Sequence, residues 1–162
     1  MEIFNDREKF DIKDSILTFE SLITDASPEI SSILKGKNVI ILPSHGYEDV
    51  YYTGTLDTLD YLNENNINAE VYATDDEYKE LGLHAADIWL GTFIIKNVVI
   101  PIFCSVMSAY IYDKIKAKKN DKISLTFIAE KKDGKTVSIE YNGKIENFNE
   151  VLNAVKGFTN EN

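Results

Sequence analysis

The sequence predicts an α/β protein with a small, partly parallel sheet, a long apolar helix and a C-terminal β-hairpin followed by a helix. The first observation is a strand–helix–strand pattern, in which the apolar run 38–42 and the alternating segment 67–73 flank a helical segment. Strands joined in this way form a βαβ unit and lie parallel. The other two observations are an uncharged stretch from Val98 to Tyr112 and a pair of alternating strands around Asp133-Gly134.

The N-terminal region carries two helical patterns. Four apolar residues at helical spacing predict an amphipathic helix within 2–24; they are Ile12, Ile16, Phe19 and Ile23. Ser27 and Pro28 suit the N-cap and first turn of a second, short helix, which Gly36 is expected to end.

The βαβ unit is expected to lead into further helical structure. Its first strand, 38–42, is a continuous apolar run ended by proline, which predicts burial on both faces. Its helix is expected to begin at Thr55 as the cap and to end near Asn65. Thr74 and Glu77 have the spacing of a capping box, so a third helix is predicted from there, with a pause at Gly82 and a continuation over 84–90.

The C-terminal part predicts a hairpin and a closing helix. Alternating apolar residues indicate half-buried strands on both sides of the turn: Ile123, Leu125 and Phe127 before it, and Val137, Ile139 and Tyr141 after it. Asn147 and Glu150 have capping-box spacing for a last helix, and Gly157 ends it. A change in the sign of charge near Gly91 divides the chain into an acidic α/β portion, 1–90, and a second portion, 91–162, within what can still be one compact domain.

Composition and charge restrict the classes of function. The chain has 162 residues, of which 44% are hydrophobic, so it should fold as a globular protein. Residues 1–90 hold 19 acidic and 6 basic side chains, a net charge of −13, which argues against nucleic acid as a partner. A single cysteine, Cys104, and a polar N-terminus predict a cytoplasmic protein. The basic cluster 114–122 can meet an acidic partner, an anionic lipid surface or, most simply, the acidic half of the same chain.

The stretch 93–119 is the most distinctive segment. Its apolar residues surround every face of the expected helix, which is typical of a helix enclosed by protein or lipid. The uncharged run would extend about 22 Å at ~1.5 Å per residue, shorter than a bilayer core of ~30 Å. A core helix or a helix packed on another chain is therefore favoured over a membrane span, although a membrane-anchored regulator stays an alternative.

Docking on another chain has specific support in this stretch. Ser105 and Ala109 are four residues apart, and such small-residue seams let helix backbones approach closely. Large side chains of interface type surround the seam. The candidate interface residues are therefore Phe103, Ser105, Met107, Ala109 and Tyr110 in the helix, with Tyr47, Tyr51 and Tyr52 in the loop after the first strand. A protein partner or self-association is predicted.

One pair of residues suggests an alternative as a small cysteine hydrolase. His45 follows the first strand, at the edge where open α/β sheets bind ligands, and Cys104 follows the apolar run 98–103. Ser44-His45-Gly46 resembles the turn that carries the catalytic histidine of caspase-like proteases, but Cys104 lacks that family's Gln-Ala-Cys-Arg-Gly pattern. A lone apolar-flanked cysteine is more often a core residue, so no catalytic set is predicted.

No cofactor or metal is expected. His45 with Glu48 and Asp49 could bind a metal, but a metal site needs three or four converging ligands and the sequence has no second cluster to supply them. Neither a G-x-G-x-x-G turn nor a P-loop is present, and Gly54-Thr55 at a helix start is the remaining candidate for one phosphate. Asp57 and its acidic neighbours would repel that phosphate.

The C-terminal part also has a recognisable arrangement: an apolar helix rich in small residues with a basic exit, VVIPIFCSVMSAYIYDKIKAKK, two strands around an Asp-Gly turn, ISLTFIAEKKDGKTVSIEYNG, and a closing helix, NFNEVLNAV. In this order of elements, residues 93–157 resemble the effector-associated adaptor modules of prokaryotic conflict systems. The resemblance implies a non-catalytic coupling role in a multi-protein, antiphage assembly. The βαβ portion ahead of the module is not part of that family's pattern.

Overall fold

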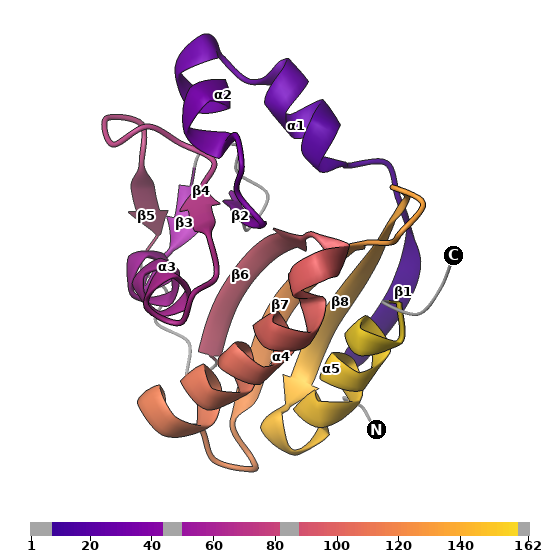
Figure 1. Ribbon diagram of the computed structural model, residues 1–162. Coiled ribbons are helices and arrows are strands. Elements are labelled where there is room, and N and C mark those ends of the chain that lie inside the picture. The colour runs from indigo at the N-terminus through magenta and orange to yellow at the C-terminus, as the bar shows by residue number, and fades with distance from the viewer. Residues whose placement is uncertain (1–7, 44–49, 82–87, 159–162) are drawn as a thin grey trace.

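A computed structural model describes residues 8–43, 50–81 and 88–158 of the chain (Figure 1). It is an α/β protein with one mixed sheet and one two-stranded sheet. In chain order the elements are β1 (Lys9–Ser15), α1 (Phe19–Asp25), α2 (Pro28–Leu34), β2 (Val39–Leu42), β3 (Val50–Tyr52), α3 (Thr55–Glu64), β4 (Ala69–Val71), β5 (Lys79–Leu81), β6 (Ile88–Ile95), a 3₁₀ turn (Asn97–Val99), α4 (Ile100–Ala109), a π-helical turn (Tyr110–Lys114), β7 (Lys122–Glu130), β8 (Thr136–Lys144), a second 3₁₀ turn (Ile145–Asn147) and α5 (Phe148–Gly157).

The mixed sheet has the strand order β1-β8-β7-β6-β2-β4, and β3 pairs with β5 in the small sheet. The predicted βαβ unit is confirmed, since β2 and β4 are parallel and α3 lies between them in the chain. A second parallel pair, β6 and β7, is connected through α4. The remaining neighbours in the mixed sheet are antiparallel.

The main core lies between the mixed sheet and the helices α3, α4 and α5. Alternate strand residues point into it because side chains alternate across a strand; Val39, Phe93 and Phe127 are all fully buried there. The helices contribute Leu62, Phe103, Met107 and Phe148, among others. Figure 1 shows α4 and α5 lying side by side across this face of the sheet.

A second, smaller core occupies the opposite face at the β2 end of the sheet. The strand residues that point away from the main core form its floor: Ile40, Leu42, Ile94 and Ile128. The helices α1 and α2 cover it with Phe19, Leu22, Ile30 and Leu34. This explains the continuous apolar sequence of β2, whose four residues are buried on both faces.

Several punctuation signals act as the sequence predicts. The Ser27 hydroxyl caps α2 by accepting a bond of 3.3 Å from the Ile30 N–H, and Pro28 occupies the first turn. In the β7–β8 hairpin, Gly134 adopts φ +86° and its N–H donates to the Lys131 carbonyl at 2.9 Å. The alternation of β7 and β8 is confirmed, with Ile123, Leu125 and Phe127 buried between half-buried Ser124 and Thr126.

The helix predicted within 2–24 is wrong for its first part. Residues 9–15 form the edge strand β1, paired antiparallel with β8, and a helix begins only at Phe19. The alternation of charged Lys9, Asp11 and Lys13 with apolar residues fits a strand, and pairing with β8 outweighs the weak helical spacing.

The helix predicted over 74–90 is wrong wherever the structure describes the chain. Glu77 does accept bonds from the N–H and hydroxyl of Thr74, at 3.2 and 3.0 Å, but they close a turn and the chain continues into β5. Residues 88–90 belong to β6, and residues 82–87 lie outside the described part. Gly91, where the charge changes sign, lies within β6.

The apolar stretch starts as a strand and becomes a helix. Residues 93–95 complete β6, and the chain turns at Lys96 into the 3₁₀ turn and α4. Pro101 lies in the first turn of α4, where its missing N–H leaves no helical bond unmade.

Thr55 is the first residue of α3 and Gly54, at φ +96°, is its cap, so the predicted cap is displaced by one residue.

Candidate functional site

The helix α4 has an apolar side that packs on the sheet. Phe103 contacts Phe93 and Phe127, with ring centroids 5.9 and 5.2 Å apart, and the two strand rings are 5.7 Å apart. Met107 and Ile111 extend the buried side toward the end of the helix. This half of the helix belongs to the main core.

The opposite side of the same helix is exposed and still apolar. Its residues follow one another at intervals of four, three, four and three, which is the spacing of one helix face. The middle three lie in α4, the first lies in the 3₁₀ turn before it, and the last lies in the π-helical turn after it. We call this set the outer stripe: Val98, Ile102, Ser105, Ala109 and Tyr112. Val98 is 76% exposed, Ile102 43% and Tyr112 37%. Ser105 is exposed and Ala109 half-buried, so the middle of the stripe is shallow.

The structure divides the predicted interface residues into two groups. Ser105 and Ala109 lie in the outer stripe, accessible as expected. Phe103, Met107 and Tyr110 do not, because they are at most 7% exposed and pack within the chain. The prediction that the apolar residues need cover on every face is met on the inner side by the chain's own core, so these three residues are not open to a partner. It missed Val98, Ile102 and Tyr112, which the spacing of the stripe could have identified.

The tyrosines after the first strand are also internal where the structure describes them. Tyr51 is 1% exposed; its hydroxyl donates to the Tyr72 carbonyl at 2.9 Å and its ring stacks on Tyr78 at 5.1 Å. Tyr52, 9% exposed, packs beside Trp89 at 5.4 Å. Both residues support the small sheet against the main one instead of forming an interface patch. Tyr47 lies outside the described residues.

The end of the helix carries a basic exit beside an acidic helix. Tyr110 connects the two helices, because its hydroxyl bonds with the Thr58 hydroxyl at 3.1 Å and its ring lies 5.0 Å from that of Tyr61. A groove of about 440 Å³ runs between them, lined by Lys114 of the π-helical turn and by Asp57, Asp60 and Glu64 of α3. Part of the basic cluster thus faces the acidic half of the chain, while Lys116, Lys118 and Lys119 are exposed beyond the helix.

Cys104 has the environment of a structural thiol. It is 1% exposed, and its Sγ donates a long bond of 3.8 Å to the Leu152 carbonyl of α5. Burial raises the pKa of Cys104 to about 12, the nearby positive charge of Lys156 opposing this only in part. Thiolate is the nucleophile in cysteine hydrolases, so this environment disfavours Cys104 in that role. The other member of the predicted dyad, His45, lies outside the described residues.

The metal and phosphate candidates fall in two places, residues 45–49 and the start of α3. Within residues 8–43, 50–81 and 88–158, no group of three His, Cys, Asp or Glu side chains could hold a metal ion. His45, Glu48 and Asp49 lie outside those ranges. At the start of α3, Gly54 is the cap and Asp57 lies in the first turn, so a negative charge is already present there.

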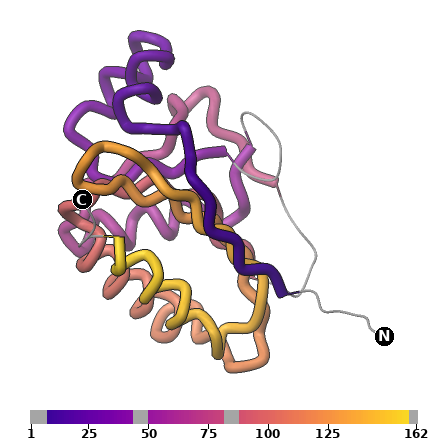
Figure 2. Tube along the Cα trace, turned by 90° about the vertical axis from the view of Figure 1, so that its right-hand side faces the viewer, coloured from indigo at the N-terminus to yellow at the C-terminus, as the bar shows by residue number. Residues whose placement is uncertain are grey.

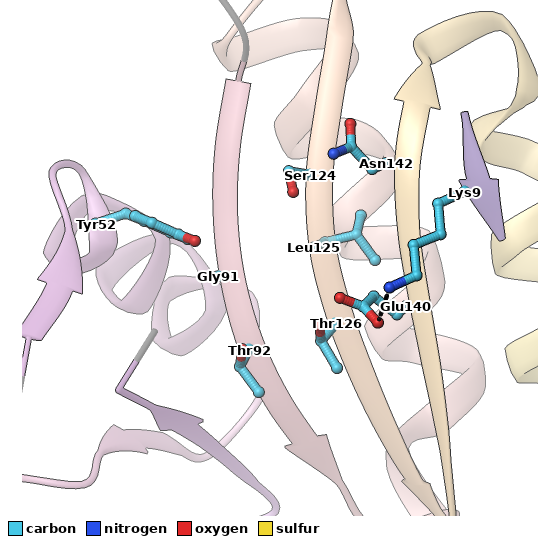
Figure 3. Close-up of a pocket in the computed structure, with 9 residues that line it drawn as sticks. All are labelled: Lys9, Tyr52, Gly91, Thr92, Ser124, Leu125, Thr126, Glu140 and Asn142. Carbon is cyan, nitrogen blue, oxygen red and sulfur yellow. Dashed lines mark ion pairs between the residues drawn. The ribbon is translucent and has the colours of Figure 1, made fainter. Parts of the chain in front are cut away.

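A polar cleft that the sequence did not single out lies on the sheet face opposite α4 and α5. It has a volume of about 330 Å³, and side chains from four strands of the main sheet and from β3 line it, as Figure 3 shows. The hydroxyls of Thr92, Ser124 and Thr126 form its floor. Lys9 and Glu140 pair across one side at 3.0 Å, and the hydrogen bond and charge of Glu140 raise the pKa of Lys9. The alternation in β7 and β8 is the signal that could have revealed this face.

Comparison with known proteins supplies no relative: no family model, no curated protein and no solved structure matches the chain. Among the residues described, no helix has both the length and the apolar character to cross a membrane.

Proposed function

We propose that the chain is a non-catalytic adaptor or regulatory subunit that binds a helix of a partner protein through the outer stripe. One observation carries this proposal: α4 and the 3₁₀ turn before it stay apolar on their solvent side, with Ile102 43% and Val98 76% exposed, instead of becoming polar as a surface helix normally does. Cys104, the nucleophile of the alternative cysteine hydrolase, supports the same conclusion because it is buried and its thiol is held protonated.

The spacing of the stripe favours a helical partner. Apolar positions separated alternately by four and three residues are those of a coiled-coil seam, in which each side chain inserts between residues of the facing helix. The stripe covers two such repeats, from Val98 to Tyr112. Ser105 and Ala109 lie in its middle, where small side chains let the two backbones approach.

The charges around the stripe favour a partner with acidic residues at one end of its helix. Lys116, Lys118 and Lys119 are exposed where the helix ends. Opposite charge at that end would set the direction in which the partner helix binds and would increase the rate of association. The resemblance of residues 93–157 to effector-associated modules suggests the context, an antiphage assembly in which the chain couples other subunits.

The test is affinity capture of the full chain from its native cells, with Ala109→Arg as the disrupting variant. Ala109 is in the shallow middle of the stripe, so an arginine there projects outward and separates the two helices. We expect the partner's affinity to fall at least about tenfold, while the melting temperature of the variant stays close to that of the wild type.

A matched control is Asn153→Arg, which places the same charge on the exposed side of the neighbouring helix α5. A partner that is retained by the wild type and by Asn153→Arg, and lost by Ala109→Arg, supports the proposal. Equal capture by all three proteins, or no stripe-dependent partner at all, contradicts it.

A further inference from the structure

The strand β1 forms an accessible edge of the main sheet. It pairs with β8 through all seven residues, and no other described strand pairs with its second side. Figure 2, which turns this side toward the viewer, shows β1 running across the front of the molecule. Its apolar side chains are unusually accessible, with Phe10 39% and Ile12 50% exposed. An open edge of this kind can accept another strand.

The edge is held in an extended conformation by contacts at both ends. At the first residue, Lys9 pairs with Glu140 of β8 at 3.0 Å. At the last, the buried Thr136 hydroxyl contacts the carbonyl oxygens of Ser15 and Leu17 at 3.0 and 2.6 Å. Phe10 packs edge-on against Tyr141 at 5.9 Å. A strand ordered in advance loses less conformational entropy when a partner strand binds.

The sequence of β1 is self-complementary when two copies run antiparallel. We propose that two copies of the chain associate through β1, about a two-fold axis at Ile12, to continue the sheet from one copy into the other. Ile12 is the middle residue of Lys9–Ser15, so this register uses the whole strand. Asp11 of each copy then faces Lys13 of the other, and the two Ile12 side chains meet on the opposite face.

The neighbouring symmetric registers are disfavoured by charge. With the axis at Asp11, the two Asp11 side chains would face each other and Lys9 would face Lys13. With the axis at Lys13, the two lysines would face each other. Like charges directly opposite one another destabilise a strand pair, whereas opposite charges stabilise it. Lys13 forms no ion pair with a described residue of its own chain, so it is available to the second copy.

Charge reversal tests the register directly. In a dimer of the Asp11→Lys variant, a lysine at position 11 of one copy would face Lys13 of the other. In a dimer of the Lys13→Asp variant, Asp11 of one copy would face an aspartate at position 13 of the other. We expect each variant alone to dimerise about tenfold or more weakly than the wild type, from two cross-strand pairs per dimer. An equal mixture of the two variants should recover dimers, because each introduced charge then faces its opposite. Analytical ultracentrifugation of the full chain over a range of concentrations measures all four samples.

Ser32→Arg is the control for this experiment, since it places a charge on an exposed position of α2, which covers the β2 end of the sheet. Its dimerisation should equal that of the wild type. A wild type that stays monomeric at several hundred micromolar, charge variants that dimerise as the wild type does, or a mixture that fails to recover dimers overturns the proposal. Dimers that Ala109→Arg alone disrupts would place self-association at the stripe and would also overturn it.

Discussion

The two faces of the main sheet are built differently along their length. The face under α3, α4 and α5 is apolar, with Phe93, Phe103 and Phe127 fully buried in one aromatic cluster. The opposite face is apolar only under α1 and α2. Farther along, toward β8 and β1, it is lined by hydroxyls and by the Lys9–Glu140 pair.

This difference separates the strands by what covers them. Strand β2 lies under helices on both sides and is apolar at every position, whereas β8 lies under helices on one side and alternates. The edge strand β1 is the extreme case, since none of its residues is buried. Stability should therefore depend mainly on the face that α3, α4 and α5 cover.

The largest expected effect comes from opening the aromatic cluster. Phe103→Ala should lower the free energy of unfolding by about 3–5 kcal/mol, because it removes a fully buried ring and leaves a cavity between α4 and the sheet. Thr126→Val, on the polar face of the same sheet, should change it by no more than about 0.5 kcal/mol. Urea unfolding followed by circular dichroism measures both. Similar losses for the two variants would show that the faces contribute equally.

The next effect concerns access to the helical face. Cys104 lies between α4 and α5, and burial raises its pKa to about 12. At pH 8 the native thiol should react with iodoacetamide at least about 100-fold more slowly than in denaturant, where an ordinary cysteine pKa of ~8.5 gives a substantial thiolate fraction. Mass spectrometry of quenched samples gives both rates. Rapid labelling of the folded protein would restore the hydrolase alternative.

The same contrast explains which elements the sequence predicts well. The β7–β8 hairpin and α5 follow from their sequence because each has one buried side, so period and burial agree. The end of β6, residues 93–95, reads as helix because it is buried on both faces, and a continuous apolar run does not distinguish a buried strand from a buried helix. β1 was mistaken because its partner, β8, lies more than a hundred residues later in the chain, and nothing local records that pairing.

For the candidate site, too, the sequence does not show which side of the helix is buried. Small residues at Ser105 and Ala109 identified the accessible side of α4, but Phe103 and Met107 could not be assigned to the core from sequence alone. Their burial depends on which side of the helix the sheet occupies. The sequence does not show which side this is, because Val98 and Ile102 on the solvent side are as apolar as the core residues.

A smaller effect is expected where β1 is attached. Thr136→Val keeps the shape of a 2%-exposed side chain but removes the hydroxyl that contacts the Ser15 and Leu17 carbonyls. The free energy of unfolding should fall by about 1 kcal/mol, and amide hydrogens of β1 should exchange faster than those of β7. Thr126→Val is the matched control, because it removes a hydroxyl with no such contacts. Equal exchange of β1 in the two variants would show that Thr136 does not hold the edge.

The smallest expected effect on stability comes from the part of the sheet that α1 and α2 cover. Glu130, at the end of β7, has its pKa raised by burial, and the charge of Lys96 offsets this only partly. A carboxyl whose pKa is higher in the folded state favours folding when protonated, so its contribution is lost as the pH rises through the folded pKa. Glu130→Gln should therefore stabilise the protein at pH 7 by about 0.5 kcal/mol and have little effect at pH 4. Thermal melts at the two pH values test this, and destabilisation at pH 7 would mean that the attraction of Lys96 outweighs the cost of burying the charge.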